Sequence, residues 1–152
     1  MNTDITGAKP PEELHLTITL PVAPQVVYNA WLSNTGHRDF TGASAVIQAR
    51  NGGNFSVCDG YITGILLKLE PPRRIIQSWR TADFHPLDAS STVELIFDAV
   101  PAGTRLILHH TDIPAGLSSQ ISAGWQVSYF EPMLGYFTHL ARLHPSDQIT
   151  GV

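Results

Sequence analysis

The segment GWQVSYFEPMLGYF, residues 124–137, carries five aromatic side chains and has a proline in its middle. With a period of 3.6 residues it predicts a helix with one apolar face. This face consists of Trp125, Tyr129, Pro132 with Met133, Tyr136 with Phe137, and Leu140. A solid core, the wall of a ligand cavity or a partner protein would each bury such a face. The fold predicted from the rest of the sequence is needed to distinguish these three environments.

Pro132 predicts that this helix is kinked or broken. Proline removes a backbone hydrogen bond and clashes with the carbonyl four residues back. We therefore expect two halves with different surroundings. Trp125 and Tyr129 would lie over the mouth of a cavity, and the half from Met133 to Leu140 would pack as solid core.

Composition and charge restrict the class of protein. A chain of 152 residues with 43% hydrophobic and 14% charged residues is typical of one globular domain. The net charge of −4, without a lysine and arginine cluster, argues against a nucleic-acid partner. The sequence has no apolar run long enough to span a membrane and no signal-like N-terminus. With the lone Cys58, this favours a cytoplasmic protein.

The strand signals precede the long helix. Residues 14–21 alternate as a strand, and residues 23–33 follow as a short helix with Pro24 in its first turn. Six further strands are predicted at 43–49, 54–60, 61–70, 74–80, 92–99 and 104–112. Gly64, inside the third of these, suggests a bulge or a close backbone approach. Residues 1–13 and 144–152 are expected to be tails on a single domain spanning 14–143.

This order predicts an α+β fold. Without βαβ alternation the sheet is antiparallel, with its helices on one face. Six to seven strands must curl, so the sheet would wrap around the C-terminal helix, with one or two short helices after the first strand.

Four motifs resemble a known family. They are GGNFSVCDGYITG (52–64), LEPPRRIIQSWR (69–80), DIPAG (112–116) and GWQVSYFE (124–131). In this order and spacing they resemble the activator of heat-shock protein 90 ATPase homologue (Aha-type) family, over roughly Leu14 to Leu143. That family belongs to the START-like (SRPBCC) superfamily. The resemblance implies the helix-grip fold of the birch-pollen allergen, a curved antiparallel sheet around a C-terminal helix.

The resemblance also implies functions. The family name implies regulation of a chaperone ATPase as one hypothesis. The matching part of the eukaryotic co-chaperones looks like their second domain only, so this hypothesis is less favoured than ligand binding. Elsewhere in the superfamily the space between helix and sheet holds lipids, sterols, plant hormones or polyketides, and some members are cyclases or aromatases. We favour a binding module for a small hydrophobic or amphipathic ligand over an enzyme. No cofactor is expected, and monomer and homodimer stay open.

Strand alternation identifies the side chains that would line this space. On residues 92–112 the inward set is Val93, Leu95 and Phe97, paired with Leu106, Leu108, His110 and Asp112, which leaves Glu94 and His109 on the outer face. The predicted ligand-binding residues are Gln77, Trp79, Leu95, Leu108, His110, Trp125, Tyr129, Met133 and Phe137.

His110 has two interpretations. As a structural residue it would hydrogen-bond Tyr129 or Glu131. As a functional residue it would bind or protonate a ligand, with Tyr129 or Asp112 as its acid/base partner in a cyclase or aromatase. A metal site is not expected, because His109 and His110 point to opposite faces of the strand.

Overall fold

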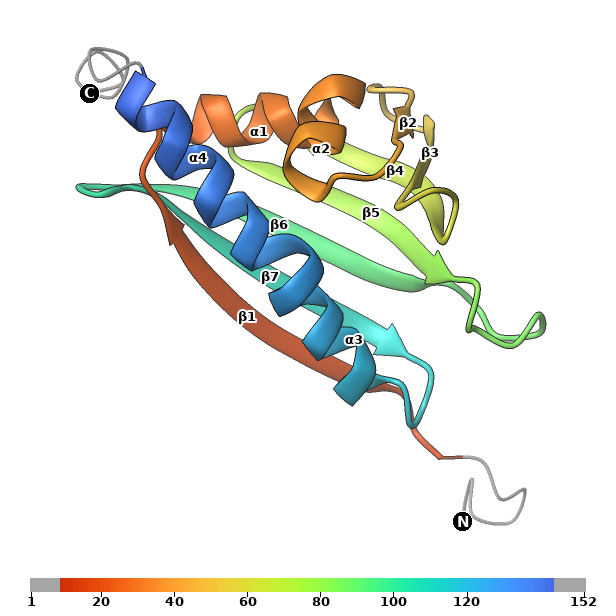
Figure 1. The fold of residues 1–152 in the computed structure, drawn as a ribbon. Helices are drawn as coiled ribbons and strands as arrows, with labels where there is room; N and C mark the ends of the chain where they lie inside the picture. Colours follow the sequence, from red (N-terminus) through yellow and green to blue (C-terminus); the bar gives the residue numbers. More distant parts are fainter. Residues whose placement is uncertain (1–8, 144–152) are drawn as a thin grey trace.

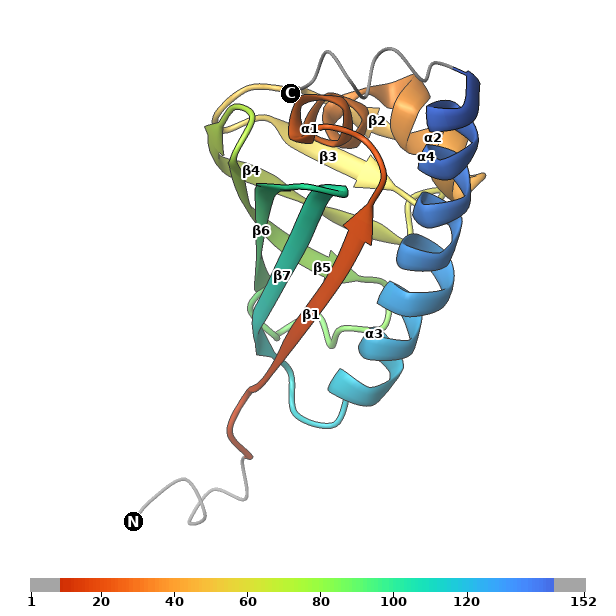
Figure 2. The ribbon, with the colours of Figure 1, turned by 90° about the vertical axis from the view of Figure 1, so that its left-hand side faces the viewer.

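The computed structural model describes residues 9–143, which form a seven-stranded antiparallel sheet with its helices on one face (Figures 1 and 2). The strand order is β1-β7-β6-β5-β4-β3-β2. The strands are β1 (Glu12–Leu20), β2 (Val46–Ile47), β3 (Asn54–Val57), β4 (Ile62–Glu70), β5 (Arg74–Thr81), β6 (Ser91–Val100) and β7 (Gly103–Ile113). The helices are α1 (Pro24–Leu32), α2 (Asn34–Thr41), α3 (Ser118–Gly124) and α4 (Glu131–Leu143), with the π-helical segment η2 (Trp125–Phe130) between the last two. The predicted helix-grip fold is confirmed.

Two strands differ in length from their predictions. β1 begins at Glu12, so the last two residues of the predicted N-terminal tail belong to the sheet. β2 keeps only Val46 and Ile47, because the residues after it enter a tight turn in which the Gly53 N–H donates to the Arg50 carbonyl at 2.8 Å. Residues 9–11 of the predicted N-terminal tail precede the strand, and residues 1–8 and 144–152 lie outside the described residues.

The central strands bury alternate side chains, as predicted. Leu95 pairs with Leu108 and Val93 pairs with His110 across β6 and β7. On β5 the buried set is Ile75, Gln77, Trp79 and Thr81. The covered face of the sheet is therefore apolar, with a few polar groups placed among the large side chains.

Asp112 does not join the inward set. β1 pairs Leu14 with His110 but Glu12 with Ile113, so β7 has one residue more than β1 in this interval. Asp112 adopts the left-handed conformation (φ 58°) and is exposed, and Ile113 takes the buried position. This β-bulge reverses the parity of the strand. The prediction for Asp112 is wrong for that reason.

The C-terminal helix passes Pro132 without a break in its helical structure. α3, η2 and α4 follow one another directly and form the long helix that crosses the sheet in Figure 1. The N–H of Glu131 donates to the Gln126 carbonyl, five residues back instead of four. A π-helical turn is wider than an α-helical one and makes room where a proline would clash. The expected break at Pro132 is therefore not found, and a π-helical segment ends two residues before the proline.

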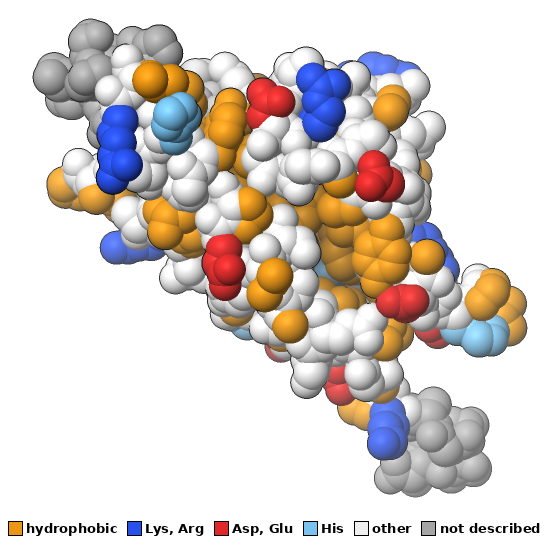
Figure 3. All heavy atoms as spheres, in the orientation of Figure 1, with side chains coloured by type: hydrophobic (Ala, Val, Ile, Leu, Met, Phe, Trp, Pro, Cys, Tyr) orange, Lys and Arg blue, Asp and Glu red, His pale blue; other side chains and the backbone are white. Residues whose placement is uncertain are grey.

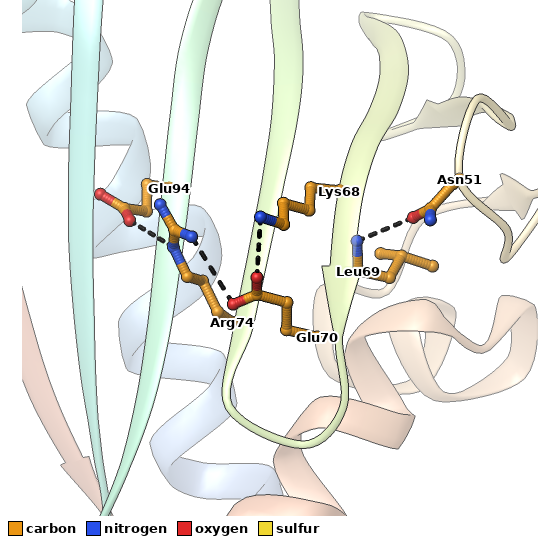
Figure 4. A network of polar contacts seen from close by, with 6 residues as sticks. All are labelled: Asn51, Lys68, Leu69, Glu70, Arg74 and Glu94. Carbon is orange, nitrogen blue, oxygen red and sulfur yellow. Dashed lines mark hydrogen bonds and ion pairs between the residues drawn. The ribbon is translucent and has the colours of Figure 1, made fainter.

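The outer face of the sheet carries a polar network (Figure 4). The Arg74 Nε donates to the Glu94 Oε2 at 2.6 Å, and Glu70 accepts from Arg74 at 3.5 Å and from Lys68 at 3.0 Å. Glu94 also faces His109, at 3.5 Å from Nδ1 to Oε1, as the predicted register requires. These charged side chains make the uncovered face polar, as is typical of the solvent-facing side of an antiparallel sheet. The apolar face packs against the helix.

Gly64 provides a test of the packing between strands. A Cβ at this position would overlap the Ser78 carbonyl and approach the Phe55 ring to 2.6 Å, because Phe55 lies opposite Gly64 in the ladder. Gly64→Ala should lower the free energy of unfolding by about 3 kcal/mol. At Gly135, on the exposed side of α4, a Cβ would meet nothing within 4 Å. Gly135→Ala should therefore raise it by about 0.5–1 kcal/mol.

Urea unfolding of the two variants and the wild type measures both changes. Equal stability of Gly64→Ala and the wild type would contradict the close approach of β4 to β5.

Candidate functional site

A cleft of about 370 Å³ opens between the C-terminal helix and one end of the sheet. Its walls come from the β3–β4 turn, the facing ends of β4 and β5, the residues around the end of α2, and the first half of the long helix. Figure 3 shows hydrophobic side chains gathered in this region, between the helix and the β3–β4 hairpin. The cleft is therefore set off from the interior of the sheet, which the second half of the helix covers.

Three predicted ligand-binding residues lie at the base of this cleft. Trp79, Trp125 and Tyr129 line it, and each is at most 5% exposed. Ile62 and Ile121 add aliphatic surface to the two sides. The base is thus aromatic and fixed within the core, while the mouth is lined by polar side chains.

All three tryptophans stack in one column. Trp125 lies between Trp31 of α1 and Trp79 of β5, with ring centroids 6.3 and 5.6 Å away and interplanar angles of 23° and 27°. The Trp31 Nε1 donates to the Gln77 Oε1 at 3.1 Å. Gln77 therefore orients the column. Gln77 also lines a small void of about 10 Å³, which shares Trp79 and Tyr129 with the larger cleft.

His110 lies beneath the column and is fully hydrogen-bonded. Its Nδ1 accepts from the Trp125 Nε1 at 3.0 Å, so the ring proton is on Nε2, which donates to the Ser91 hydroxyl at 2.8 Å. Ser91 in turn donates to the Trp79 carbonyl at 2.6 Å. The predicted partners Tyr129 and Glu131 are not the ones found. Burial lowers the pKa of His110 to about 3, so the ring is neutral.

Tyr129 bonds a different histidine, His37, which the sequence analysis missed. The Tyr129 hydroxyl donates to the His37 Nε2 at 2.7 Å, and the His37 Nδ1 donates to the Trp31 carbonyl at 2.9 Å. Burial lowers the pKa of His37 to about 4 and raises the pKa of Tyr129. Cys58 approaches the same hydroxyl at 3.8 Å, and burial raises the pKa of its thiol.

A helix signal around His37 was available in the sequence. The Ser33 side chain caps α2 by accepting from the Gly36 N–H, and Gly42 ends the helix with a φ of 77°. Within these limits His37 and Phe40 are three residues apart, and both are buried. The residues of this segment also favour turns, so the pattern left a second short helix after the first strand optional.

The other predicted ligand-binding residues lie away from the cleft. Leu95, Leu108, Met133 and Phe137 are fully buried, and neither they nor His110 line it. The two halves of the long helix have different surroundings, but no break at Pro132 divides them, and Trp125 and Tyr129 lie at the base of the cleft instead of over its mouth. Trp125 and Tyr129 face the cleft, and Met133 and Phe137 pack in the core.

The mouth of the cleft is polar. Asp59 lines it and accepts a hydrogen bond from the Ser44 N–H at 2.8 Å. Tyr61 and Gln120 also line it, and both donate to the Asp83 Oδ2, at 2.6 and 3.0 Å. Asp83 thus links the loop after β5 to the start of the long helix, next to the opening.

Comparison with known proteins gives the family. Residues 21–137 match the family described as Activator of Hsp90 ATPase homolog 1-like protein. The chain belongs to this family. Human activator of 90 kDa heat shock protein ATPase homolog 1 is 30% identical over 138 residues, which are 90% of this chain and 40% of that protein. The mouse homolog 2 is 31% identical over 126 residues, 83% of this chain and 38% of that protein. The chain spans about two fifths of the length of these relatives.

A solved structure agrees with the fold. The crystal structure of an HSP90 activator from Plasmodium falciparum superposes with a TM-score of 0.71 at 26% identity, and the match covers 88% of this chain and 96% of that one. No helix within residues 9–143 has the length and apolar character to cross a membrane. In the same part of the chain no three His, Cys, Asp or Glu side chains form a metal-binding group.

The two buried histidines predict a pH dependence of stability. Both have folded-state pKa values below the ordinary value of about 6.5, so below that pH the unfolded chain binds more protons than the folded one. Their stabilising contribution is present above about pH 6.5 and decreases as the pH falls, by up to about 1.4 kcal/mol per pH unit for each histidine.

Urea unfolding between about pH 7 and pH 5 measures how the free energy of unfolding changes with pH. His37→Asn keeps a donor for the Trp31 carbonyl but cannot titrate, so its slope should be shallower than that of the wild type. Titration of the imidazole signals by NMR in the wild-type protein is independent of any variant. Protonation of His37 and His110 near the ordinary histidine pKa would contradict the prediction.

Proposed function

We propose that this chain binds a small hydrophobic or amphipathic molecule in the cleft between the helix and the sheet. The observation that supports the proposal is the cleft itself, about 370 Å³ with an aromatic base of Trp79, Trp125 and Tyr129. Small-molecule sites have volumes of about 300–1,000 Å³ and are mostly apolar, with a few polar groups that orient the ligand. Here those groups are at the mouth.

The surroundings of His110 favour binding over acid/base catalysis. Both ring nitrogens are hydrogen-bonded within the core, and His110 does not line the cleft. A general acid or base has to reach the proton that it transfers and has to change protonation state near the working pH. A cyclase or aromatase reaction at His110 therefore has no geometric support.

Gly124 offers a way to fill the cleft without disturbing the core. It lines the cleft on the same helix face as Ile121, Trp125 and Ser128, and a Cβ there would meet nothing within 4 Å. Gly124→Leu should place its side chain in the cleft and weaken binding of Nile red, a neutral planar dye, by about tenfold or more, since about 1.4 kcal/mol of lost contact gives this factor. Gly135→Leu is the matched control, at an open helix position outside the cleft.

Fluorescence titration with Nile red measures the affinities, and native mass spectrometry of freshly purified protein detects a retained ligand. Cys58 gives a second signal, because it is the single cysteine of the chain and lines the cleft. Its alkylation by N-ethylmaleimide should slow when the dye is bound. Absence of binding by the wild type, or equal binding by the two leucine variants, would overturn the proposal.

Regulation of a chaperone ATPase is the second candidate function. The observation that favours it is the name of the human and mouse relatives, activators of the 90 kDa heat shock protein ATPase, at 30% and 31% identity. This chain matches about two fifths of those proteins, so their activity is a hypothesis for it. The outer face of the sheet, which no helix covers within the described residues, is available for a partner.

An ATPase assay with the 90 kDa heat-shock chaperone of the source organism tests the second function. Addition of this chain in stoichiometric amounts should raise the rate of ATP hydrolysis. Gly124→Leu should raise it equally, because the substitution lies within the cleft. Arg105→Glu, exposed on the outer face of β7, should reduce the effect. An unchanged rate of ATP hydrolysis, together with no co-purification of the chaperone with this chain, would contradict this function.

A further inference from the structure

The cleft has fixed negative charge at its mouth. Asp59 lines it and is exposed, and the hydrogen bond from the Ser44 N–H lowers the pKa of its carboxyl group. The Asp59 N–H also donates to the Ser44 carbonyl at 3.3 Å, so two hydrogen bonds hold this residue to the loop after α2. The carboxylate is therefore ionised at neutral pH and held in one place.

Asp83 adds a second carboxylate near the opening. Tyr61 and Gln120, which both line the cleft, donate to the same oxygen of Asp83. Tyr61 follows the β3–β4 turn and Gln120 is in α3, so the Asp83 carboxylate is held between the sheet and the helix. Asp83 is itself exposed, and its charge acts on whatever enters from solvent.

The titratable groups beneath the mouth are neutral. Burial places the pKa of His37 at about 4 and that of His110 at about 3, so neither ring is a cation at neutral pH. Burial also raises the pKa of Tyr129 and of Cys58, which keeps both protonated. The base of the cleft thus provides aromatic surface without a formal charge.

No positive charge compensates the carboxylates. Within the described residues the lining contains no lysine or arginine. Arg80 follows Trp79 in β5, but its guanidinium donates to the carbonyls of His85 and Asp88 and lies over the Phe84 ring at 5.5 Å. The whole chain has a net charge of −4. An anionic head group at the mouth would meet like charge and no donor cation.

We propose that the cleft selects its ligands by charge, taking neutral or cationic amphiphiles and rejecting anionic ones such as fatty acids or alkyl phosphates. The inference rests on the proposed ligand-binding function. In this arrangement the apolar part of the ligand packs on Trp79, Trp125 and Tyr129, and its head group lies between Asp59 and Asp83.

Three probes with the same alkyl chain test the selection: decyltrimethylammonium, decyl maltoside and decanoate, all below their micelle concentrations. Displacement of Nile red gives the affinity of each. At low ionic strength the cation should bind about tenfold more tightly than the carboxylate, and added salt should reduce this difference because charges at the mouth are screened. The maltoside should bind independently of salt.

Asp59→Asn separates the effect of the charge on ligand binding from any effect on the fold. An asparagine oxygen can still accept from the Ser44 N–H, so the substitution removes the charge and keeps the loop contact. It should reduce the ratio of cation to carboxylate affinity by about threefold, about 0.65 kcal/mol, and leave the maltoside unchanged. Asp98→Asn, the same change of charge on the exposed end of β6, should leave the ratio at the wild-type value.

The outcomes separate the two proposals. Binding of decanoate as tight as that of the cation, or an unchanged ratio in Asp59→Asn, would overturn charge selection while ligand binding stands. A fall of the ratio in Asp98→Asn equal to that in Asp59→Asn would show that net charge, and not the mouth, is responsible. Failure of all three probes and of Nile red to bind would remove the proposed function and this inference together.

Discussion

The stack of three indole rings is the contact on which the rest of the structure depends. Trp125 of the long helix lies between Trp31 of α1 and Trp79 of β5, so one column joins the long helix, α1 and the sheet. Each aromatic pair contributes about 0.5–1.5 kcal/mol beyond the area that it buries. Hydrogen bonds from Trp31 to Gln77 and from Trp125 to His110 fix the rotation of two of the rings. The column therefore sets the height and the orientation of the helix over the sheet.

Because of the π-helical segment, the long helix can contribute side chains both to this column and to the solid core further along the helix. Trp125, Tyr129 and Phe130 are all buried, although Tyr129 and Phe130 are neighbours in sequence. A turn with one extra residue lets both face inward and then returns α4 to a phase that buries Met133 and Phe137. Pro132 follows directly, where the widened turn accommodates it. Substitution of Pro132 or of Trp125 would thus disturb the same π-helical segment.

Strand alternation and the family motifs were sufficient to predict the antiparallel sheet, the register between β6 and β7, and the face that the helix covers. They failed where the backbone departs from regular geometry. Asp112 left the inward set because of a bulge on β7. The partners of His110 could not be derived, because they depend on which side chain of a distant helix lies above it. His37 was hidden in a segment whose turn-forming residues also cap a short helix. For Trp79, Trp125 and Tyr129, helix and strand period predicted only an apolar, inward-facing position, and the expectation of a cavity beside them came from the family resemblance.

The cleft lies where the first half of the long helix faces the ends of β4 and β5 and the β3–β4 turn. There the aromatic base meets solvent instead of further core. His37, His110, Tyr129 and Ser91 have their hydrogen bonds satisfied inside the protein, so none of these four needs a ligand. A ligand in this cleft would be held by apolar contact at the base and by charge at the mouth. On the proposed function, this separation would allow the affinity for the alkyl part and the preference for a head group to change independently by substitution.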